Sequence, residues 1–335
     1  MSAASLTDFE KKKKFLLEHE DFFLDGISVW FDLTHRQLTK YRTILKWYSI
    51  VANRSIEWNL EIMHEFKELI FVSDDPFPEI NVNQSLPWSI EFITPFEDLW
   101  SWELLSQNDA LTDIPVVRRH FSNRLYPYLG EYEECGIEPY NAPAMTLTEE
   151  LELELNSLNM YKEWQLQSAE EIDKTKNIDW IRLSQNQVLP WSANLIEKYK
   201  EKWDWWFLCT NASIPWSVQL IRQFEDYIDW TQDITDEDGI TTMTMDSISA
   251  NFSIEWDAEL LSPFITKLNA SDICFSQCAK WDIDLLMQFS SFWKYESLVV
   301  NKLMWDKVFS EFNNEEHLNT LLDAVLEKAT LPNTN

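Results

Sequence analysis

Carboxylates are the most numerous groups in this chain that could do chemistry. The 335 residues include 57 Asp or Glu against 27 Lys or Arg, which gives a formal net charge of −30. Paired carboxylates can act as general acid and base, and carboxylate oxygens bind hard cations. Because acidic side chains are so abundant here, any two of them could be proposed as a pair. Their number alone therefore predicts no catalytic residue.

The acidic residues concentrate in three stretches that contain neither Lys nor Arg. Residues 68–117 contain ten acidic residues, residues 125–161 contain eight, and residues 223–266 contain eleven. A surface of one sign attracts partners of opposite charge; the alternative is that the charge only keeps a Trp-rich chain in solution. The candidate binding residues in the last two stretches are Glu131, Glu133, Glu134, Glu138, Asp233, Asp236, Glu237 and Asp238.

Metal and cofactor sites are not predicted. The run Asp236 to Gly239 resembles part of a calcium loop, but an EF-hand needs an acidic residue at position one and Glu at position twelve, where Ile234 and Met245 stand. A turn or hairpin tip explains the run better. The four Cys form no CxxC pair and the five His are scattered, so neither a zinc site nor a disulfide framework is expected. No catalytic motif is present, and we expect no enzyme activity and no cofactor.

Eighteen Trp residues could form a binding surface, but their spacing indicates a repeat. The pattern is Asn, two residues, Leu or Ile, one residue, Trp. Asn hydrogen-bonds its own backbone and tolerates a left-handed conformation, so we expect it to close the preceding turn. The anchors are Trp58, Trp88, Trp191, Trp216, Trp256 and Trp281, and the Asn residues are Asn53, Asn83, Asn186, Asn211 and Asn251.

The residues that follow each anchor predict a helix. Apolar residues stand four and five positions after the Trp, and an aromatic residue stands eight positions after it. These offsets share one face of an α-helix. The residue directly after the Trp is a good N-cap in every copy: Asn59, Ser89, Ser192, Ser217, Asp257 or Asp282. A second Trp fourteen positions after the anchor is predicted to begin a second helix.

The repeats predict an all-α, solenoid-like fold with units of about 25 residues in two arrays. Degenerate units around Leu33 and Asp113 extend the first array. If the short second element were a strand, the fold would be an α/β solenoid, and Ile50–Val51 and Ile80–Val82 fit that alternative. The expected divisions are an N-terminal capping helix at 1–27, a first array at 28–125, an acidic insertion or linker at 126–175, a second array at 176–296 with an insertion at 231–247, and C-terminal capping helices and tail at 297–335.

Residues 183–205 are similar to a known repeat. Leu189-Pro190-Trp191-Ser192 followed by Trp203-Asp204-Trp205 resembles the pattern LSxNxxLPWSxELIxxYxxxWDW of uncharacterised bacterial and large-virus proteins. The match is good at 86–102 and 214–230 and weaker elsewhere. This resemblance implies the repeat register and a microbial or viral origin. It implies no activity and no catalytic residues.

The favoured function is a non-catalytic interaction scaffold whose acidic surface binds a basic protein. An immunity or anti-defence protein that neutralises a nuclease or toxin is one form of it. The alternatives are a nucleic-acid mimic, with carboxylates in the place of phosphates, and an enzyme or carbohydrate-binding protein that uses exposed Trp. Trp outside the repeat register are the candidates for that last role: Trp30, Trp164, Trp206 and Trp305.

Charge and hydropathy also limit where the protein could act. Its negative charge would repel phosphates, so direct binding of nucleic acid is not expected. No stretch of the sequence is apolar and long enough to span a membrane, and no secretory signal is recognisable. We therefore expect no membrane partner and a cytoplasmic location, which would be the host cytoplasm for a viral protein.

Overall fold

The computed structural model describes residues 6–71, 78–125, 162–228, 230, 234–235, 241–242 and 248–330. Within these ranges the protein is all-α, apart from one pair of two-residue strands. The chain divides into two compact units. Unit 1 comprises residues 1–140 and 309–335, and unit 2 comprises residues 141–308.

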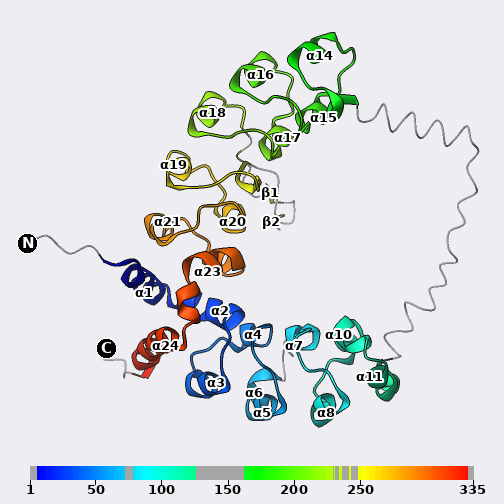
Figure 1. The fold of residues 1–335 in the computed structure, drawn as a ribbon, viewed down its shortest axis with the longest axis vertical. Coiled ribbons are helices and arrows are strands. Elements are labelled where there is room, and N and C mark those ends of the chain that lie inside the picture. Colours follow the sequence, from blue (N-terminus) through cyan, green and yellow to red (C-terminus); the bar gives the residue numbers. More distant parts are fainter. Residues whose placement is uncertain are drawn as a thin grey trace, which may run out of the picture. The chain divides into compact units, whose positions relative to one another are not determined.

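Unit 1 contains two rows of short helices (Figure 1). Helices α3, α5, α6, α8 and α11 form the first row, and α4, α7, α9 and α10 form the second. Helices α1, α2 and α24 complete the unit. The bounds are α1 Asp8–Glu18, α2 Glu20–Trp30, α3 His35–Tyr41, α4 Trp47–Ile50, α5 Leu60–Glu65, α6 Lys67–Ile70, α7 Pro78–Val82, α8 Ile90–Ile93, η1 Thr94–Phe96, α9 Trp102–Ser106, α10 Asp109–Thr112, α11 Pro115–His120, η4 Ser310–Asn313 and α24 Glu315–Thr330.

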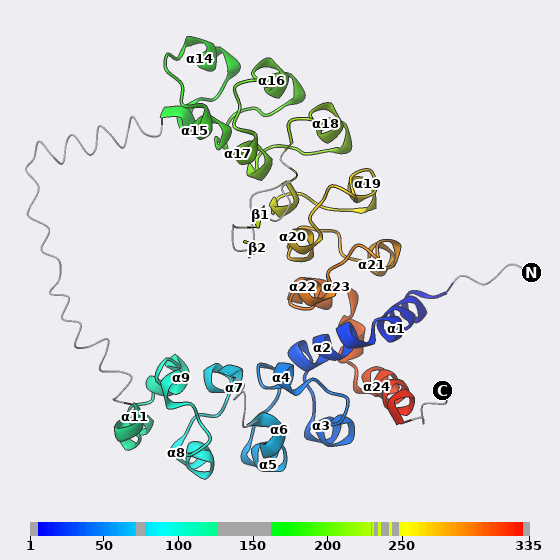
Figure 2. The ribbon, with the colours of Figure 1, turned by 180° about the vertical axis from the view of Figure 1, so that it is seen from behind.

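Unit 2 repeats the two-row arrangement, as the view from behind shows (Figure 2). Helices α14, α16, α18, α19 and α21 form its first row, and α15, α17, η3, α20 and α22 its second. The bounds are η2 Lys162–Gln165, α14 Ala169–Lys174, α15 Trp180–Ser184, α16 Ala193–Lys198, α17 Trp205–Thr210, α18 Val218–Gln223, β1 Ile234–Thr235, β2 Thr241–Thr242, η3 Ile248–Ala250, α19 Ala258–Leu261, α20 Ala270–Cys274, α21 Ile283–Gln288, α22 Tyr295–Leu298 and α23 Lys302–Val308.

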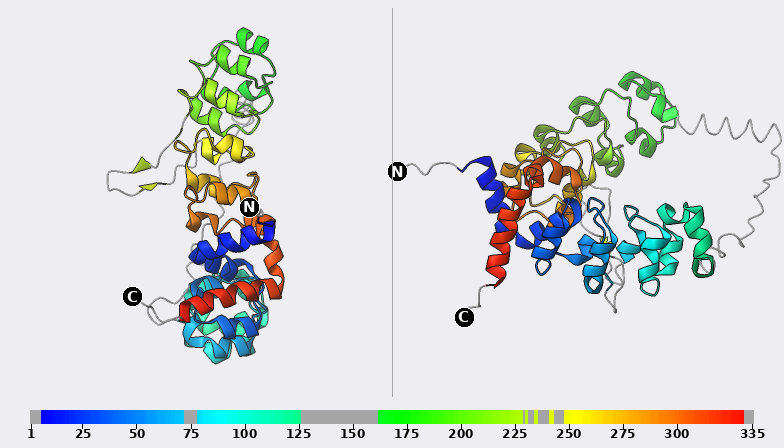
Figure 3. Two further views of the ribbon diagram at one scale, coloured as in Figure 1. Left: turned by 90° about the vertical axis from the view of Figure 1, so that its left-hand side faces the viewer. Right: turned by 60° about the horizontal axis from the view of Figure 1, so that its bottom comes forward.

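The two strands lie within the expected insertion at 231–247. β1 pairs antiparallel with β2, with Ile234 opposite Thr242 and Thr235 opposite Thr241. Figure 3 shows this pair to one side of the helical rows of unit 2. The expectation of a hairpin is met on either side of the tip, and the tip itself lies outside the described residues.

The predicted N-caps begin the first-row helices. In all six copies the side-chain oxygen of the residue after the anchor accepts the backbone N–H three residues later, as Asn59 does from Ile62 at 3.0 Å. The apolar residue five positions after the anchor is 0% exposed in every copy: Met63, Ile93, Ile196, Ile221, Leu261 and Leu286. Capping and the buried stripe therefore confirm the predicted helix after each Trp.

The repeated Asn residues link each repeat to the one before it. In unit 2, Asn211 Nδ2 donates to Ser184 O at 2.8 Å and to Asn186 O at 2.9 Å. Its Oδ1 accepts the Ser213 N–H at 2.9 Å, two residues along the chain. Asn186, Asn251 and Asn301 donate in the same way to pairs of backbone carbonyls of the preceding repeat. We call this set of buried amides, with its counterparts in unit 1, the amide ladder.

The amide ladder of unit 1 follows the same rule. Asn83 Nδ2 donates to Val51 O at 2.9 Å and to Asn53 O at 3.2 Å. Asn108 departs from this rule, because it donates only to Asn81 O, at 2.8 Å, and its Oδ1 has no partner among the described residues.

The Asn residues close the preceding turn as expected, since the N–H groups of Asn53, Asn186 and Asn211 each donate to the carbonyl three residues earlier. They do so without a left-handed conformation, because Asn177 is the one non-glycine residue with positive φ in the described part of the chain. The hydrogen bond between each Asn side chain and its own neighbouring backbone was predicted correctly. The bonds that the Asn Nδ2 donates to carbonyls of the preceding repeat were not predicted.

Four of the six anchor indoles donate to the backbone carbonyl five residues earlier: those of Trp58, Trp88, Trp191 and Trp281. Trp58 Nε1 donates to Asn53 O at 3.0 Å, Trp88 to Asn83 O at 3.2 Å and Trp191 to Asn186 O at 2.9 Å. The peptide oxygens of Asn53 and Asn186 thus accept one donor from their own repeat and one from the next. Buried carbonyls of this kind have two lone pairs, and both are used.

Two predictions of secondary structure differ from the structure. The α/β alternative is wrong for the segments that suggested it, because Ile50 ends α4 and Ile80 lies within α7. The expected single N-terminal helix is two helices that meet at His19, which has a φ of −117° and a ψ of 60°. This break allows the rings of Phe15 and Phe22 both to contact Phe309.

The C-terminal helix α24 packs within unit 1, beside α1 and α3. Its stripe of Leu318, Leu321, Leu322 and Val325 is buried, as the sequence predicts. Tyr41 Oη donates to Asp323 Oδ1 at 2.9 Å, and Lys40 Nζ pairs with the same atom at 2.6 Å. Helix α24 therefore covers the end of the unit 1 array that is formed by α1 and α3.

We predict that Asn211→Ala lowers the free energy of unfolding by about 2–3 kcal/mol, because two carbonyls and one N–H lose their buried partner. The control is Asn194→Ala, which removes an exposed Asn from α16 and should change stability by less than about 0.5 kcal/mol. Denaturant unfolding of the full chain measures both values. Equal effects of the two substitutions would contradict the ladder.

One position of the ladder lacks its amide, because Ser276 stands five residues before Trp281. Its hydroxyl accepts the Cys278 and Ala279 N–H groups at 3.2 Å each, so only the link to the preceding repeat is missing. We predict that Ser276→Asn raises the free energy of unfolding by about 1 kcal/mol, with exposed Ser291→Asn as the matched control. Destabilisation by Ser276→Asn alone would show that this position is shaped for serine.

Candidate functional site

Most Trp side chains are used inside the repeats. The indole twelve positions after the anchor donates to a first-row helix carbonyl, as Trp100 does to Ile93 O at 3.1 Å and Trp203 to Ile196 O at 3.0 Å. The indole fourteen positions after the anchor donates to a carbonyl just after the first-row helix, as Trp205 does to Lys200 O at 2.9 Å. Of the Trp fourteen positions after an anchor, Trp102 begins α9 and Trp205 begins α17 as predicted, whereas Trp230 begins no helix in the described residues. Because their indoles donate within the repeat, these Trp do not form a binding surface.

Two of the four Trp outside the register are exposed. Trp164 in η2 is 41% exposed and Trp206 in α17 is 38% exposed. Trp30 is half-buried. The suggestion that Trp305 is available to a ligand is wrong, because it is 2% exposed and its Nε1 donates to Val299 O at 3.0 Å.

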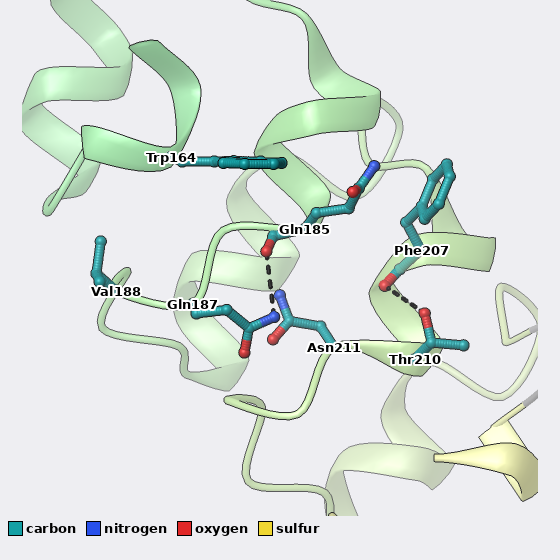
Figure 4. A pocket seen from close by; sticks show the side chains of 7 residues that line it. All are labelled: Trp164, Gln185, Gln187, Val188, Phe207, Thr210 and Asn211. Atoms are coloured by element: carbon teal, nitrogen blue, oxygen red, sulfur yellow. Dashed lines mark hydrogen bonds between the residues drawn. The ribbon is translucent and has the colours of Figure 1, made fainter. Parts of the chain in front are cut away.

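Trp164 borders a cavity of about 480 Å³ in unit 2. The cavity lies where η2 and the second-row helices α15 and α17 meet the loop after α15. Figure 4 shows Trp164 on one side, Phe207 and Thr210 on the other, and the two glutamines between them. Its lining consists of Trp164, Gln185, Gln187, Val188, Phe207, Thr210 and Asn211.

Hydrogen bonds hold the polar groups of the cavity in place. Gln187 Nε2 donates to Gln185 O at 3.2 Å, and Gln187 Oε1 accepts the Ser213 hydroxyl at 2.7 Å. The Thr210 hydroxyl donates to Phe207 O at 3.2 Å. Asn211, at the base, is the ladder residue whose amide is already fully used. The cavity is therefore a direct product of the ladder, which fixes the spacing of the elements around it.

Sequence reasoning did not find this cavity, although it singled out Trp164. Gln185 and Thr210 are both six residues before an anchor Trp, in successive repeats, and Gln187 and Val188 follow Asn186. Their positions in the register are ordinary. These residues line the same cavity only because one repeat stacks on the next.

The candidate acidic residues named from the sequence, Glu131, Glu133, Glu134, Glu138, Asp233, Asp236, Glu237 and Asp238, lie outside the described residues. The remaining acidic stretch, 68–117, is largely described. Glu79 on α7, Glu103 on α9, and Asp109 and Asp113 on and beside α10 are all exposed. Helix α9 contacts both α7 and α10, so these four carboxylates follow successive second-row helices of unit 1. We call them the acidic row.

Arg124, which follows this stretch, pairs with two of its carboxylates. Its guanidinium pairs with Glu97 at 3.3 Å and with Asp98 at 3.2 Å. Neither Glu79, Glu103, Asp109 nor Asp113 forms an ion pair with a residue that the structure describes. The acidic row therefore presents negative charge that is not neutralised by those residues.

In the described ranges, no group of three or more His, Cys, Asp or Glu is placed to hold a metal ion. None of the helices in those ranges is both long and apolar enough to span a membrane. Comparison of the chain with protein-family models, with curated proteins and with solved structures found no match. The site must therefore be interpreted from its own geometry.

Cysteine reactivity provides a test of the packing of unit 2. Cys274 is buried, and burial raises the pKa of its thiol to about 12; Cys209 is also buried, whereas Cys278 is exposed. We predict that iodoacetamide at neutral pH modifies Cys278 in the native protein and leaves Cys209 and Cys274 unmodified until denaturant is added. Peptide mass spectrometry reads each site separately. Rapid native modification of Cys274 would contradict the described packing.

Proposed function

We propose that the protein is a non-catalytic interaction scaffold that binds a basic protein. The observation that carries this proposal is the acidic row, which places exposed carboxylates on successive helices of unit 1 in a stretch without Lys or Arg. The helices hold these carboxylates at fixed positions. A partner with Lys or Arg at matching positions would gain several ion pairs at little cost in ordering the scaffold.

The charges of the acidic row would contribute more to the selection of a basic partner than to the affinity of the complex. Each exposed ion pair contributes about 0–1 kcal/mol, so the acidic row would act mainly by steering and by selecting basic partners. Such steering weakens as salt rises, because the Debye length falls to about 8 Å at physiological ionic strength. The acidic residues at 131–138 and 233–238 add to the same field through the net charge of the chain.

Neutralisation of a basic nuclease or toxin is the specific form of this function that we propose. It is supported by the −30 charge and by the resemblance of the repeat to bacterial and large-virus proteins. The cytoplasm, or the host cytoplasm for a viral protein, is the proposed location. The partner would be a protein, since phosphate backbones are repelled.

The test is affinity capture from nuclease-treated microbial lysate over a salt series, with quantitative mass spectrometry. The wild-type chain is compared with the triple variant Glu79→Lys, Glu103→Lys and Asp113→Lys. We predict that basic proteins captured by the wild type at low salt are reduced about tenfold or more by the triple variant. Nuclease treatment removes proteins that are bridged by nucleic acid.

The matched control is the triple variant Asp32→Lys, Glu57→Lys and Glu327→Lys, which changes the net charge equally at exposed positions of the same unit. It should retain the captured proteins. Loss in both triple variants would show that only bulk charge matters, and retention in both would exclude the acidic row. Thermal unfolding of each variant establishes that it is folded.

A further inference from the structure

The cavity beside Trp164 has a chemical character different from that of the rest of the surface. A quarter of the residues in the chain are charged, yet none of the seven lining residues is Asp, Glu, Lys or Arg. The lining combines two aromatic rings with the amides of Gln185 and Gln187 and the hydroxyl of Thr210. An aromatic surface beside a few fixed neutral polar groups is typical of sites for uncharged polar ligands.

The indole of Trp164 is oriented and partly exposed. Its Nε1 donates to Arg182 O at 3.1 Å, and 41% of the residue is exposed where it borders the cavity. The indole N–H is therefore already paired, and the ring can contribute its apolar surface to a ligand. Such a ring offers a flat platform for the C–H face of a sugar.

The polar groups can serve the hydroxyls of the same ligand. Gln185 Nε2 donates to Ile181 O at 3.4 Å, and Gln187 Nε2 donates to Gln185 O at 3.2 Å. Each of these bonds uses one N–H of the amide and leaves the second N–H for a ligand. The Thr210 oxygen, which donates to Phe207 O, keeps its acceptor lone pairs. Donors and acceptors thus lie beside an aromatic platform within one opening, as Figure 4 shows.

We propose that this cavity binds a neutral oligosaccharide, which stacks on Trp164 and hydrogen-bonds to Gln185, Gln187 and Thr210. A charged sugar or a nucleotide would find no basic side chain in the lining and would meet the negative field of the chain. A purely apolar ligand would leave the amides and the hydroxyl without partners. The volume of about 480 Å³ lies within the usual range for small-ligand sites.

This proposal does not depend on the acidic row, because every residue that it uses belongs to unit 2. It assigns to the protein a second binding activity. If the ligand is part of a glycan, the same chain would recognise sugar with unit 2 and protein with unit 1.

The experiment is a binding screen of the full chain against neutral hexasaccharides of glucose, N-acetylglucosamine, mannose and xylose, followed by isothermal titration calorimetry. We expect at least one to bind. Trp164→Ala should weaken that binding about tenfold or more, and Trp164→Phe should restore most of it because an aromatic platform is kept. Gln185→Ala, which leaves the indole intact, should weaken it by a smaller factor and guards against misfolding of Trp164→Ala.

The matched control is Trp206→Ala. Trp206 is nearly as exposed, at 38%, and lies on α17 next to Phe207, but it does not line the cavity. Its replacement should leave saccharide affinity unchanged. The proposal is overturned if no hexasaccharide binds, or if Trp164→Ala and Trp206→Ala weaken binding equally.

Discussion

The structure depends on one recurrent interaction, in which a buried peptide oxygen accepts two side-chain donors. Asn186 O accepts the Trp191 indole from its own repeat and the Asn211 amide from the next, both at 2.9 Å. Each net hydrogen bond contributes only about 1 kcal/mol, but leaving any of these buried groups unpaired costs more. The repeats are therefore held in register by polar groups as well as by the apolar stripe. For this reason short α-helices of four to seven residues can stack without long helical interfaces.

The ladder also explains where the stack is irregular. Neither the Trp216 nor the Trp256 indole N–H has an acceptor among the described atoms, and these two repeats flank the insertion at 231–247. The hydrogen bond from Asn251 Nδ2 to Asn211 O, which links the repeats on either side of that insertion, is also long, at 3.3 Å. The cavity beside Trp164 lies before this insertion in the chain, where the bonds that Asn186 and Asn211 donate to the preceding repeat are all 2.9 Å or shorter.

The sequence could predict what depends on neighbours along the chain. The N-caps, the buried stripe, the helix beginning at Trp205 and the final amphipathic helix all follow from local spacing. It could not predict that Asn211 donates across a repeat boundary, because the accepting carbonyls of Ser184 and Asn186 carry no side-chain signal. Asn301 continues the ladder but was missed, since Asp306 stands where the anchor Trp would be. Trp305 was misjudged because it lies outside the anchor register, which does not reveal that it is a buried residue of α23. The cavity was missed because successive repeats contribute its lining.

Hydrogen–deuterium exchange of Asn211→Ala, compared with the wild type and with Asn194→Ala, tests the ladder most directly. Removing the Asn211 amide should speed exchange both in its own repeat and in the preceding residues 180–191, whose carbonyls it binds, while residues 302–308 keep their protection. Asn194→Ala should change neither segment. If exchange in Asn211→Ala increased only around position 211, with residues 180–191 unchanged, the claim that buried amides couple successive repeats would be contradicted.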